Sequence, residues 1–281
     1  MQTNNLIGHG PSKARIVDKG DYKVVIKDFP NTEQDRVIKE TKKMQTLYSL
    51  SQETDLFKVP KILDIKDFNY TMEYIPNCKE LNDVYNEQNS FLICDKIINI
   101  INFLKNKKCE DNSISVWNAM IKKFKALKTE NKDYNTLIDY ISKKTISIPS
   151  GYSHGDFTFD NTLVNNNLDF YLIDPAWSEA ESPLWDVGKV LQSTAINWNY
   201  IKEHNCNGKR GTTLITINNI LLNGFIKTYE KEHILLATAC QLSRVARWCF
   251  PEILIPIIIK LLTVYKENNE NEFINTLRWF I

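Results

Sequence analysis

Residues 153–175, SHGDFTFDNTLVNNNLDFYLIDP, place polar side chains at the ends of two strand-like segments. Asn161 follows Asp156 by five positions across a turn, and Asp174 ends the second segment, 18 positions after Asp156. The run NNNLD between the segments has the composition of a turn. We therefore expect a hairpin whose strand ends bring these three side chains together in one cleft.

Those three side chains suit a metal–phosphate site. Two of them offer hard oxygen ligands of the kind that Mg²⁺ selects, and the third can orient or deprotonate an alcohol. A hydrophobic core would exclude such groups, whereas apolar strands can hold them rigidly at their ends. The motif thus predicts phosphate chemistry assisted by a magnesium ion.

The N-terminal part of the chain predicts a β-sheet with one inserted helix. Two β-rich runs in SKARIVDKGDYKVVIKDF flank DKGD, where Gly20 can adopt a positive φ. The following NTEQDRVIKETKKMQTLYSLS has helical spacing, and either Asn31 or Thr32 is in place to cap it. KILDIKD and NYTMEYI are typical of two more strands, and Pro76 with Asn77 breaks the last of them.

From about Leu81 the hydrophobic spacing becomes helical. The helical runs before the hairpin are FLICDKIINIINFLKN, VWNAMIKKFKALK and YNTLIDYISKK, and those after it are PLWDVGKVLQSTAINW, ITINNILLNGFIKTYEK, HILLATACQLSRVARWC and EILIPIIIKLLTVYKEN. The pattern predicts an α+β fold with a small β-rich N-lobe over residues 1–75 and a hinge near 73–79. A larger helical C-lobe over 76–281 then contains the hairpin.

Composition argues against several classes of protein. The 281 residues carry a formal net charge of +1, and lysines are interleaved with acidic residues, so we expect no surface for nucleic acid. The most apolar run, ILIPIIIKLLTVY, is interrupted by Pro256 and Lys260 and is too short to span a bilayer. The N-terminus lacks the pattern of a signal peptide. We expect a cytoplasmic protein with free cysteines and no membrane insertion, and its oligomeric state is left open.

A candidate phosphate-binding group lies in the N-terminal part. The turn in LIGHGPSKARIV exposes backbone N–H groups that can cradle phosphates. Lys27 ends the apolar run KVVIK, where its ammonium can pair with phosphates or extend to water. Glu40, 13 positions later on the predicted helix, can hold Lys27 in place, although Glu33 and Asp35 on the same helix are alternatives.

Five elements in this order resemble the aminoglycoside phosphotransferase and choline kinase family, a branch of the protein-kinase-like fold. They are the glycine-rich loop, VVIK, the helix with its glutamate, MEYI, and HGDFTFDN followed by LIDP, and the resemblance spans residues 6–190. The loop departs from the full G-x-G-x-x-G pattern, because Lys13 stands at its last position. The resemblance implies a two-lobed small-molecule kinase that uses ATP and Mg²⁺ and phosphorylates a hydroxyl group of its acceptor.

The resemblance also implies roles for individual residues. Asp156 is then the catalytic base that accepts the proton of the acceptor hydroxyl, and Asn161 and Asp174 bind Mg²⁺. Lys27 contacts the α- and β-phosphates and pairs with Glu40. The other nucleotide contacts implied are Gly8, Gly10 and Ser12 over the phosphates, Met72 as gatekeeper, and Glu73 and Ile75 at the adenine edge.

Further implied roles concern the catalytic loop and the acceptor. His154 is expected to shape the catalytic loop, and Asp186 matches a family position that supports this loop by hydrogen bonds. The alternative for Asp186 is an acidic residue in the first turn of a helix, where the helix dipole favours it. Trp177, Glu179 and Glu181 either face the acceptor or belong to a solvated loop.

The acceptor itself is less constrained by the sequence. The run ITINNILLNGFIKTY contains no acidic residue, which disfavours a strongly cationic antibiotic. A choline-like acceptor usually requires an aromatic cage, for which Trp177, Trp185, Trp198, Tyr200 and Trp248 are candidates. The HGDFTFDN and LIDPAW pattern is most similar to phosphotransferase-family members of bacterial surface-polysaccharide pathways. That similarity favours a sugar or sugar-like alcohol.

Other functions stay open at this point. The chain could be a choline, amino-alcohol or aminoglycoside kinase, or a kinase-like pseudoenzyme that binds nucleotide or a partner without catalysis. A metal-dependent hydrolase would need more histidine ligands than His154 supplies. A protein-serine kinase would need more platform for a peptide than the short stretch between Asp174 and Asp186 offers.

Overall fold

The computed structural model describes residues 3–6, 12–196, 198 and 208–278 of the chain. The chain forms two compact units. The first consists of Met1–Val84 and Asp160–Trp177, and the second consists of Tyr85–Phe159 and Ser178–Ile281. The lobe boundary at residue 75 stays a prediction, but mixed helix and strand content confirms the α+β class.

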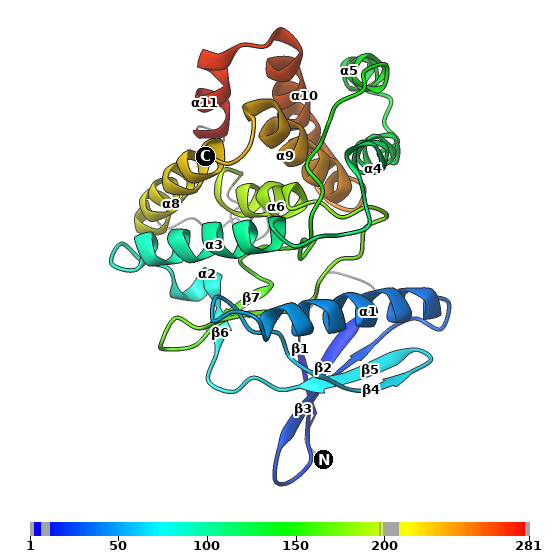
Figure 1. The fold of residues 1–281 in the computed structure, drawn as a ribbon, viewed down its shortest axis with the longest axis vertical. Coiled ribbons are helices and arrows are strands. Elements are labelled where there is room, and N and C mark those ends of the chain that lie inside the picture. The colour runs from blue at the N-terminus through cyan, green and yellow to red at the C-terminus, as the bar shows by residue number, and fades with distance from the viewer. Residues whose placement is uncertain (1–2, 7–11, 197, 199–207, 279–281) are drawn as a thin grey trace. The chain divides into compact units, whose positions relative to one another are not determined.

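The first unit is built on an antiparallel sheet of five strands in the order β1-β2-β3-β5-β4 (Figure 1). Gly20 turns the chain between β2 and β3 with a φ of +94°, and its N–H donates to the side chain of Asp18. The turn predicted at DKGD is therefore confirmed. The strands are β1 Thr3–Leu6, β2 Lys13–Asp18, β3 Lys23–Asp28, β4 Ile62–Lys66 and β5 Asn69–Glu73.

Helix α1, Gln34–Ser51, is inserted between β3 and β4 and contacts β4 and β5. It buries one apolar face that includes Met44 and Leu47. The predicted cap is wrong, because the helix begins after Glu33, which makes no side-chain capping bond. The N–H of Glu33 donates to the carbonyl of Pro30, and this turn keeps the two polar residues between them outside the helix. Those residues are Asn31 and Thr32, the two predicted caps.

A second, three-stranded sheet in the first unit contains the predicted hairpin. Strands β7, Thr162–Val164, and β8, Phe170–Leu172, pair antiparallel, and Thr162 lies opposite Leu172. Strand β6, Lys79–Glu80, pairs with β7 and is followed by α2, Leu81–Val84. The sequence did not predict β6, because two residues are too few for a visible alternation. The break after β5 is confirmed, since Asn77 has a φ of +58°.

The second unit is helical, as predicted, and α9 packs against both α6 and α10. Helices α6 and α9 cross closely at Gly188, where an added Cβ would lie 2.6 Å from the carbonyl oxygen of Ala237. Every residue of α6 is buried. The helices are α3 Ser90–Lys105, α4 Ser113–Lys125, α5 Lys132–Ser142, α6 Leu184–Thr194, α8 Gly208–Ile226, α9 Lys231–Ala246, α10 Pro251–Glu267 and α11 Glu270–Arg278.

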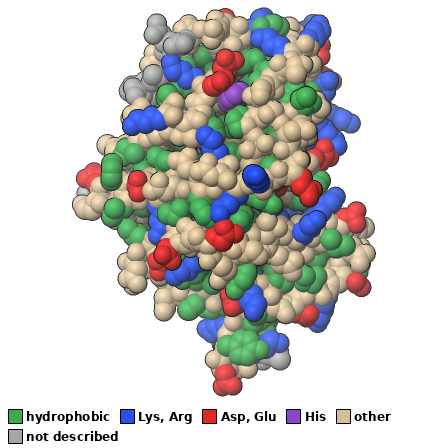
Figure 2. Space-filling model, viewed as in Figure 1, with side chains coloured by type: hydrophobic (Ala, Val, Ile, Leu, Met, Phe, Trp, Pro, Cys, Tyr) green, Lys and Arg blue, Asp and Glu red, His purple; other side chains and the backbone are tan. Residues whose placement is uncertain are grey.

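The most apolar run forms α10, which continues through Pro256 and buries Leu254, Ile258 and Leu261 along one side. Among the described residues, no helix has the combined length and apolar character needed to cross a bilayer. Figure 2 shows lysine and arginine side chains mixed with aspartate and glutamate side chains on the visible face. This mixing agrees with the interleaved charges of the sequence.

Candidate active site

In the first unit, β3 presents Lys27 to two carboxylates. Its ammonium lies 2.5 Å from Glu40 on α1 and 3.1 Å from Asp174, which follows β8. The hydroxyl of Tyr70 on β5 donates to the same oxygen of Glu40 at 2.7 Å. Lys27, Glu40 and Tyr70 are all buried. Of the three acids that the sequence offered as a partner for Lys27, the structure therefore selects Glu40.

The electrostatics of this group keep Lys27 charged. Burial alone lowers the pKa of Lys27, but the carboxylates of Asp174 and Glu40 outweigh burial and raise it above its ordinary value. Burial and the nearby Glu40 carboxylate also raise the pKa of Tyr70 well above its ordinary value, so its hydroxyl remains a donor. The result is a fixed ammonium whose second partner is the more exposed Asp174.

The hairpin brings Asn161 and Asp174 to the same end of its two strands. The N–H of Ile173 donates to the carbonyl of Asn161 at 3.0 Å, one step beyond the last strand pair. Asp174 follows directly, with a φ of +55°. Aspartate is one of the few residues other than glycine that tolerates this left-handed conformation, although it carries some strain there.

The donor set at this hairpin end fits a magnesium ion. It combines a carboxylate with an amide oxygen, and Mg²⁺ typically binds one or two such protein groups while keeping water or phosphate oxygens as its other ligands. Among the residues that the structure describes, no group of three or more His, Cys, Asp or Glu side chains forms a metal cage.

The other described residues predicted at the nucleotide lie on or near the five-stranded sheet. Met72 is buried on β5 opposite Val25, and Glu73 ends that strand. The carboxylate of Glu73 accepts a hydrogen bond from the N–H of Lys61. Ile75 and Ser12 are half-buried. Gly8 and Gly10 lie outside the described residues.

In the second unit, two cations surround Asp156. The ammonium of Lys189 on α6 lies 2.9 Å from Asp156 Oδ1, and the Arg244 guanidinium on α9 lies 3.5 Å from the same oxygen. Burial would raise the pKa of Asp156, but Lys189 and Arg244 hold it well below its usual range. The carboxylate is therefore ionised at neutral pH.

Sequence reasoning missed both cations. Lys189 had a readable signal, because it lies three positions after Asp186 within an apolar helix, and a lysine on a buried helix face needs a counter-charge. Arg244 had none, since α9 lies far along the chain from Asp156 and only tertiary packing brings the two together.

Asp186 fixes the loop that carries Asp156 through two hydrogen bonds to its backbone. One oxygen of this buried carboxylate accepts the N–H of His154 at 2.6 Å, and the other accepts the N–H of Gly155 at 2.7 Å. Gly155 has a φ of +83°, and its carbonyl accepts a hydrogen bond from Arg244. His154 is fully buried and lies edge-on to Phe157.

The three residues suggested for the acceptor differ in their partners. Trp177, in the first unit, is 46% exposed and lies under the ammonium of Lys39. In the second unit, Glu179 pairs with the exposed Lys122, and Glu181 accepts a hydrogen bond from the hydroxyl of Ser153.

The other tryptophans proposed for an aromatic cage also differ in environment. Trp185 is fully buried and donates to the carbonyl of Ala180. Trp198 lies edge-on to Phe250, whereas Trp248 is exposed. Tyr200 lies outside the described residues.

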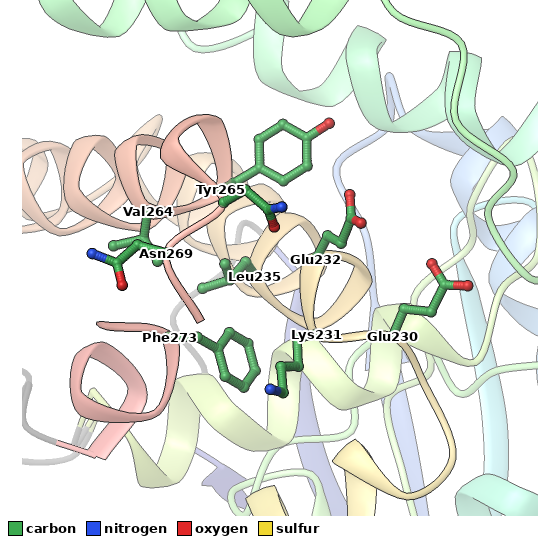
Figure 3. A pocket seen from close by; sticks show the side chains of 9 residues that line it. Glu230, Lys231, Glu232, Leu235, Val264, Tyr265, Asn269 and Phe273 are labelled. Carbon is green, nitrogen blue, oxygen red and sulfur yellow. The ribbon is translucent and has the colours of Figure 1, made fainter. Parts of the chain in front are cut away.

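The second unit also contains a cavity of about 270 Å³ among α9, α10 and α11 (Figure 3). Leu235, Val264 and Phe273 line it together with the acidic Glu230 and Glu232. Its lining includes none of the residues that surround Asp156. It is thus a feature separate from the candidate site.

The fold is that of solved small-molecule kinases, although no protein-family model and no curated protein matches the sequence. A choline kinase from Streptococcus pneumoniae is 15% identical, with a TM-score of 0.55, over 99% of this chain and 93% of its own. An amicoumacin kinase, solved with AMP-PNP and Ca²⁺, is 11% identical, with a TM-score of 0.61, over 95% of this chain and 89% of its own. An ADP-bound aminoglycoside phosphotransferase is 12% identical, with a TM-score of 0.55, over 100% of this chain and 93% of its own. The protein-kinase-like fold expected from the sequence is thereby confirmed.

Proposed function

We propose that this chain is a small-molecule kinase that transfers the γ-phosphoryl group of ATP, with Mg²⁺, to a hydroxyl group of its acceptor. The observation that carries the proposal is the position of Lys27, whose buried ammonium pairs with both Glu40 and Asp174. An ammonium fixed between a helix carboxylate and a partly exposed metal-type carboxylate suits phosphates that share a metal ion. The names of the solved structures that share the fold support the same activity.

At the nucleotide, Lys27 contacts the α- and β-phosphates, and Glu40 with Tyr70 holds the ammonium in position. Asn161 and Asp174 hold Mg²⁺ at the end of the hairpin. When bound, the metal ion supplies positive charge that neutralises the phosphate oxygens during transfer. Gly8, Gly10 and Ser12 cover the phosphates, and Met72, Glu73 and Ile75 meet the adenine.

At the acceptor, Asp156 orients the hydroxyl by accepting its hydrogen bond. The hydroxyl oxygen forms a bond to the γ-phosphorus while the bond from that phosphorus to the bridging oxygen breaks, and ADP leaves. The proton of the hydroxyl passes to the Asp156 carboxylate. Because Lys189 and Arg244 hold the pKa of Asp156 low, this residue is a weak base and acts mainly by orientation. Phosphoryl transfer through a loose transition state depends mainly on such positioning and needs no strong base.

For the acceptor, we retain a sugar or sugar-like alcohol, such as one of a bacterial surface-polysaccharide pathway. Choline, amino alcohols and aminoglycosides are the alternatives within the same reaction class. The run Ile215–Tyr229 covers the C-terminal part of α8 and the three residues after it, and its lack of acidic residues supports a non-cationic acceptor.

The test is ADP release from Mg·ATP with a panel of sugars, amino alcohols and aminoglycosides. We expect one acceptor class to stimulate release, and Asp156→Asn to abolish the stimulation while ATP still binds. ATP binding with no stimulated release would favour the pseudoenzyme instead. A chain that binds no ATP would overturn the proposal.

A further inference from the structure

A third cation lies on α4, a helix that packs against α9, which carries Arg244. Lys123 on α4 is half-buried, and its ammonium lies 3.5 Å from the ring centroid of the buried Trp185. It donates one hydrogen bond, to the hydroxyl of Ser178 at 2.9 Å. The contacts that hold Lys123 in the structure are thus an aromatic ring and a neutral hydroxyl.

The surroundings of Lys123 disfavour its charged form. Burial lowers the pKa of Lys123 to about 8, and both Arg244 and Lys189 act in the same direction. Cys240 and Glu181 act in the opposite direction without reversing the shift. Burial lowers the pKa of Lys189, Asp156 opposes that shift, and Arg244 adds to it, as expected for cations that repel one another.

The acidic groups nearby already have partners. Both oxygens of Asp186 accept backbone N–H groups of the catalytic loop, and Glu181 accepts the hydroxyl of Ser153. Asp156 is shared between Lys189 and Arg244. Asp156 pairs with Lys189 and Arg244 but not, among the described residues, with Lys123. The repulsion between Lys123 and these two cations, in buried and half-buried positions, is therefore costly. A bound anion would relieve that repulsion.

We propose that the acceptor carries an anionic group, a carboxylate or a phosphate, which Arg244 and Lys123 bind beside the hydroxyl that Asp156 orients. The proposal rests on the proposed function, under which Lys27 and the metal ion serve the phosphates of ATP in the first unit. An arginine guanidinium matches the planar, forked geometry of both groups. The same cations repel an ammonium, which argues against choline, amino alcohols and aminoglycosides as acceptors.

The first experiment compares four acceptors that differ in one substituent: a hexose, the corresponding hexuronate, the hexose 6-phosphate and the hexosamine. Binding is measured by calorimetry, and transfer by ADP release from Mg·ATP. We expect the hexuronate or the hexose phosphate to bind at least ten-fold more tightly than the hexose, and the hexosamine to bind more weakly than either. The two anionic members distinguish a carboxylate from a phosphate as the preferred group.

The second experiment assigns the preference to residues. Arg244→Gln and Lys123→Met should each raise the KM for the anionic acceptor at least ten-fold and leave the KM for ATP within two-fold. The matched controls are Arg247→Gln, at the exposed C-cap of α9, and Lys125→Met, at the exposed last residue of α4, and they should change neither constant. The hydrogen bond of Lys123 goes to Ser178, whereas that of Arg244 goes to Gly155 in the loop that carries Asp156, so Lys123→Met remains informative if Arg244→Gln misfolds.

The outcomes separate this inference from the proposed function. Anionic members that bind preferentially but release no ADP would support the inference and contradict the kinase. Transfer to the hexose or hexosamine in preference to both anionic members would support the kinase and overturn the inference. The inference also fails if neither anionic member binds, or if the two substitutions raise the KM for ATP instead.

Discussion

The ammonium nitrogen of Lys189 lies 2.9 Å from a carboxylate oxygen of Asp156, and the lysine side chain is only 4% exposed. A buried cation at this distance fixes the charge of Asp156, the residue to which we assign the acceptor hydroxyl. Breaking one side of such a pair leaves the other charge buried without compensation. The pair therefore links the stability of the second unit to the pH range of the proposed reaction.

Replacing Lys189 by Met should move the acid limb of the pH–activity profile to higher pH. In the native chain, the pKa of Asp156 is held low. The stability that its ionised form contributes is therefore complete above the ordinary carboxyl pKa of about 3.9, and it is lost as pH falls through the lower pKa of the folded state. Without Lys189, Arg244 still opposes the effect of burial but the larger opposing charge is gone, so that pKa rises. We expect the acid limb of kcat/KM to rise by about one pH unit or more. Lys189→Arg should retain the native profile, and an unchanged limb in Lys189→Met would contradict the assignment.

Replacing Gly155 by Ala should damage the catalytic loop. Gly155 has a φ of +83°, where a side chain costs about 1–2 kcal/mol, and both its N–H and its carbonyl are hydrogen-bonded. Gly20→Ala is the matched control, since Gly20 has a φ of +94° in an exposed turn with open space around it. Urea unfolding should show a similar loss in both variants. Only Gly155→Ala should lower kcat, and equal activities would refute a special role for this loop.

Replacing Asp186 by Asn distinguishes the two interpretations that the sequence left open. An amide can accept only one of the two backbone N–H bonds, so a buried donor is left unpaired at a cost of about 1–3 kcal/mol. Asp133→Asn is the control, because Asp133 is an exposed acid in the first turn of α5. A dipole effect alone would cost both variants the same few tenths of a kcal/mol. Unfolding free energies and kcat of the two variants decide between them.

Lys123 should give the chain a distinctive alkaline stability profile. Its pKa is about 8 in the folded state and about 10.4 when unfolded, so the folded state binds fewer protons between these values. The free energy of unfolding therefore rises with pH across this window, on the order of 1 kcal/mol after screening. The difference between the native chain and Lys123→Met should show that rise, whereas Lys125→Met should not. A flat difference would indicate an unperturbed lysine.

Much of the first unit could be predicted from the sequence because its determinants are local. The turn at Gly20 and the hairpin after Asn161 lie within single short segments with alternating apolar residues. The Lys27–Glu40 pair spans only one strand and the helix that follows it. The cap of α1 was wrong because a turn at Pro30, rather than a polar side chain, sets the start of the helix.

The cations of the second unit were harder to predict. Arg244 reaches Asp156 from α9, far along the chain, through packing that no local pattern encodes. Lys123 looks like one of several lysines on α4 until tertiary packing places it over Trp185. The charge of the proposed acceptor site is thus a property of helix packing.

The most direct test of the central claim is calorimetric titration of the whole chain with ATP, in the presence and absence of Mg²⁺. It needs no knowledge of the acceptor. The account predicts binding that Mg²⁺ strengthens, at least a ten-fold loss in Lys27→Met, and native affinity in Lys19→Met, at an exposed turn position beside the same strand. If ATP does not bind, or if Lys27→Met binds it as tightly as the native chain, the kinase account is contradicted.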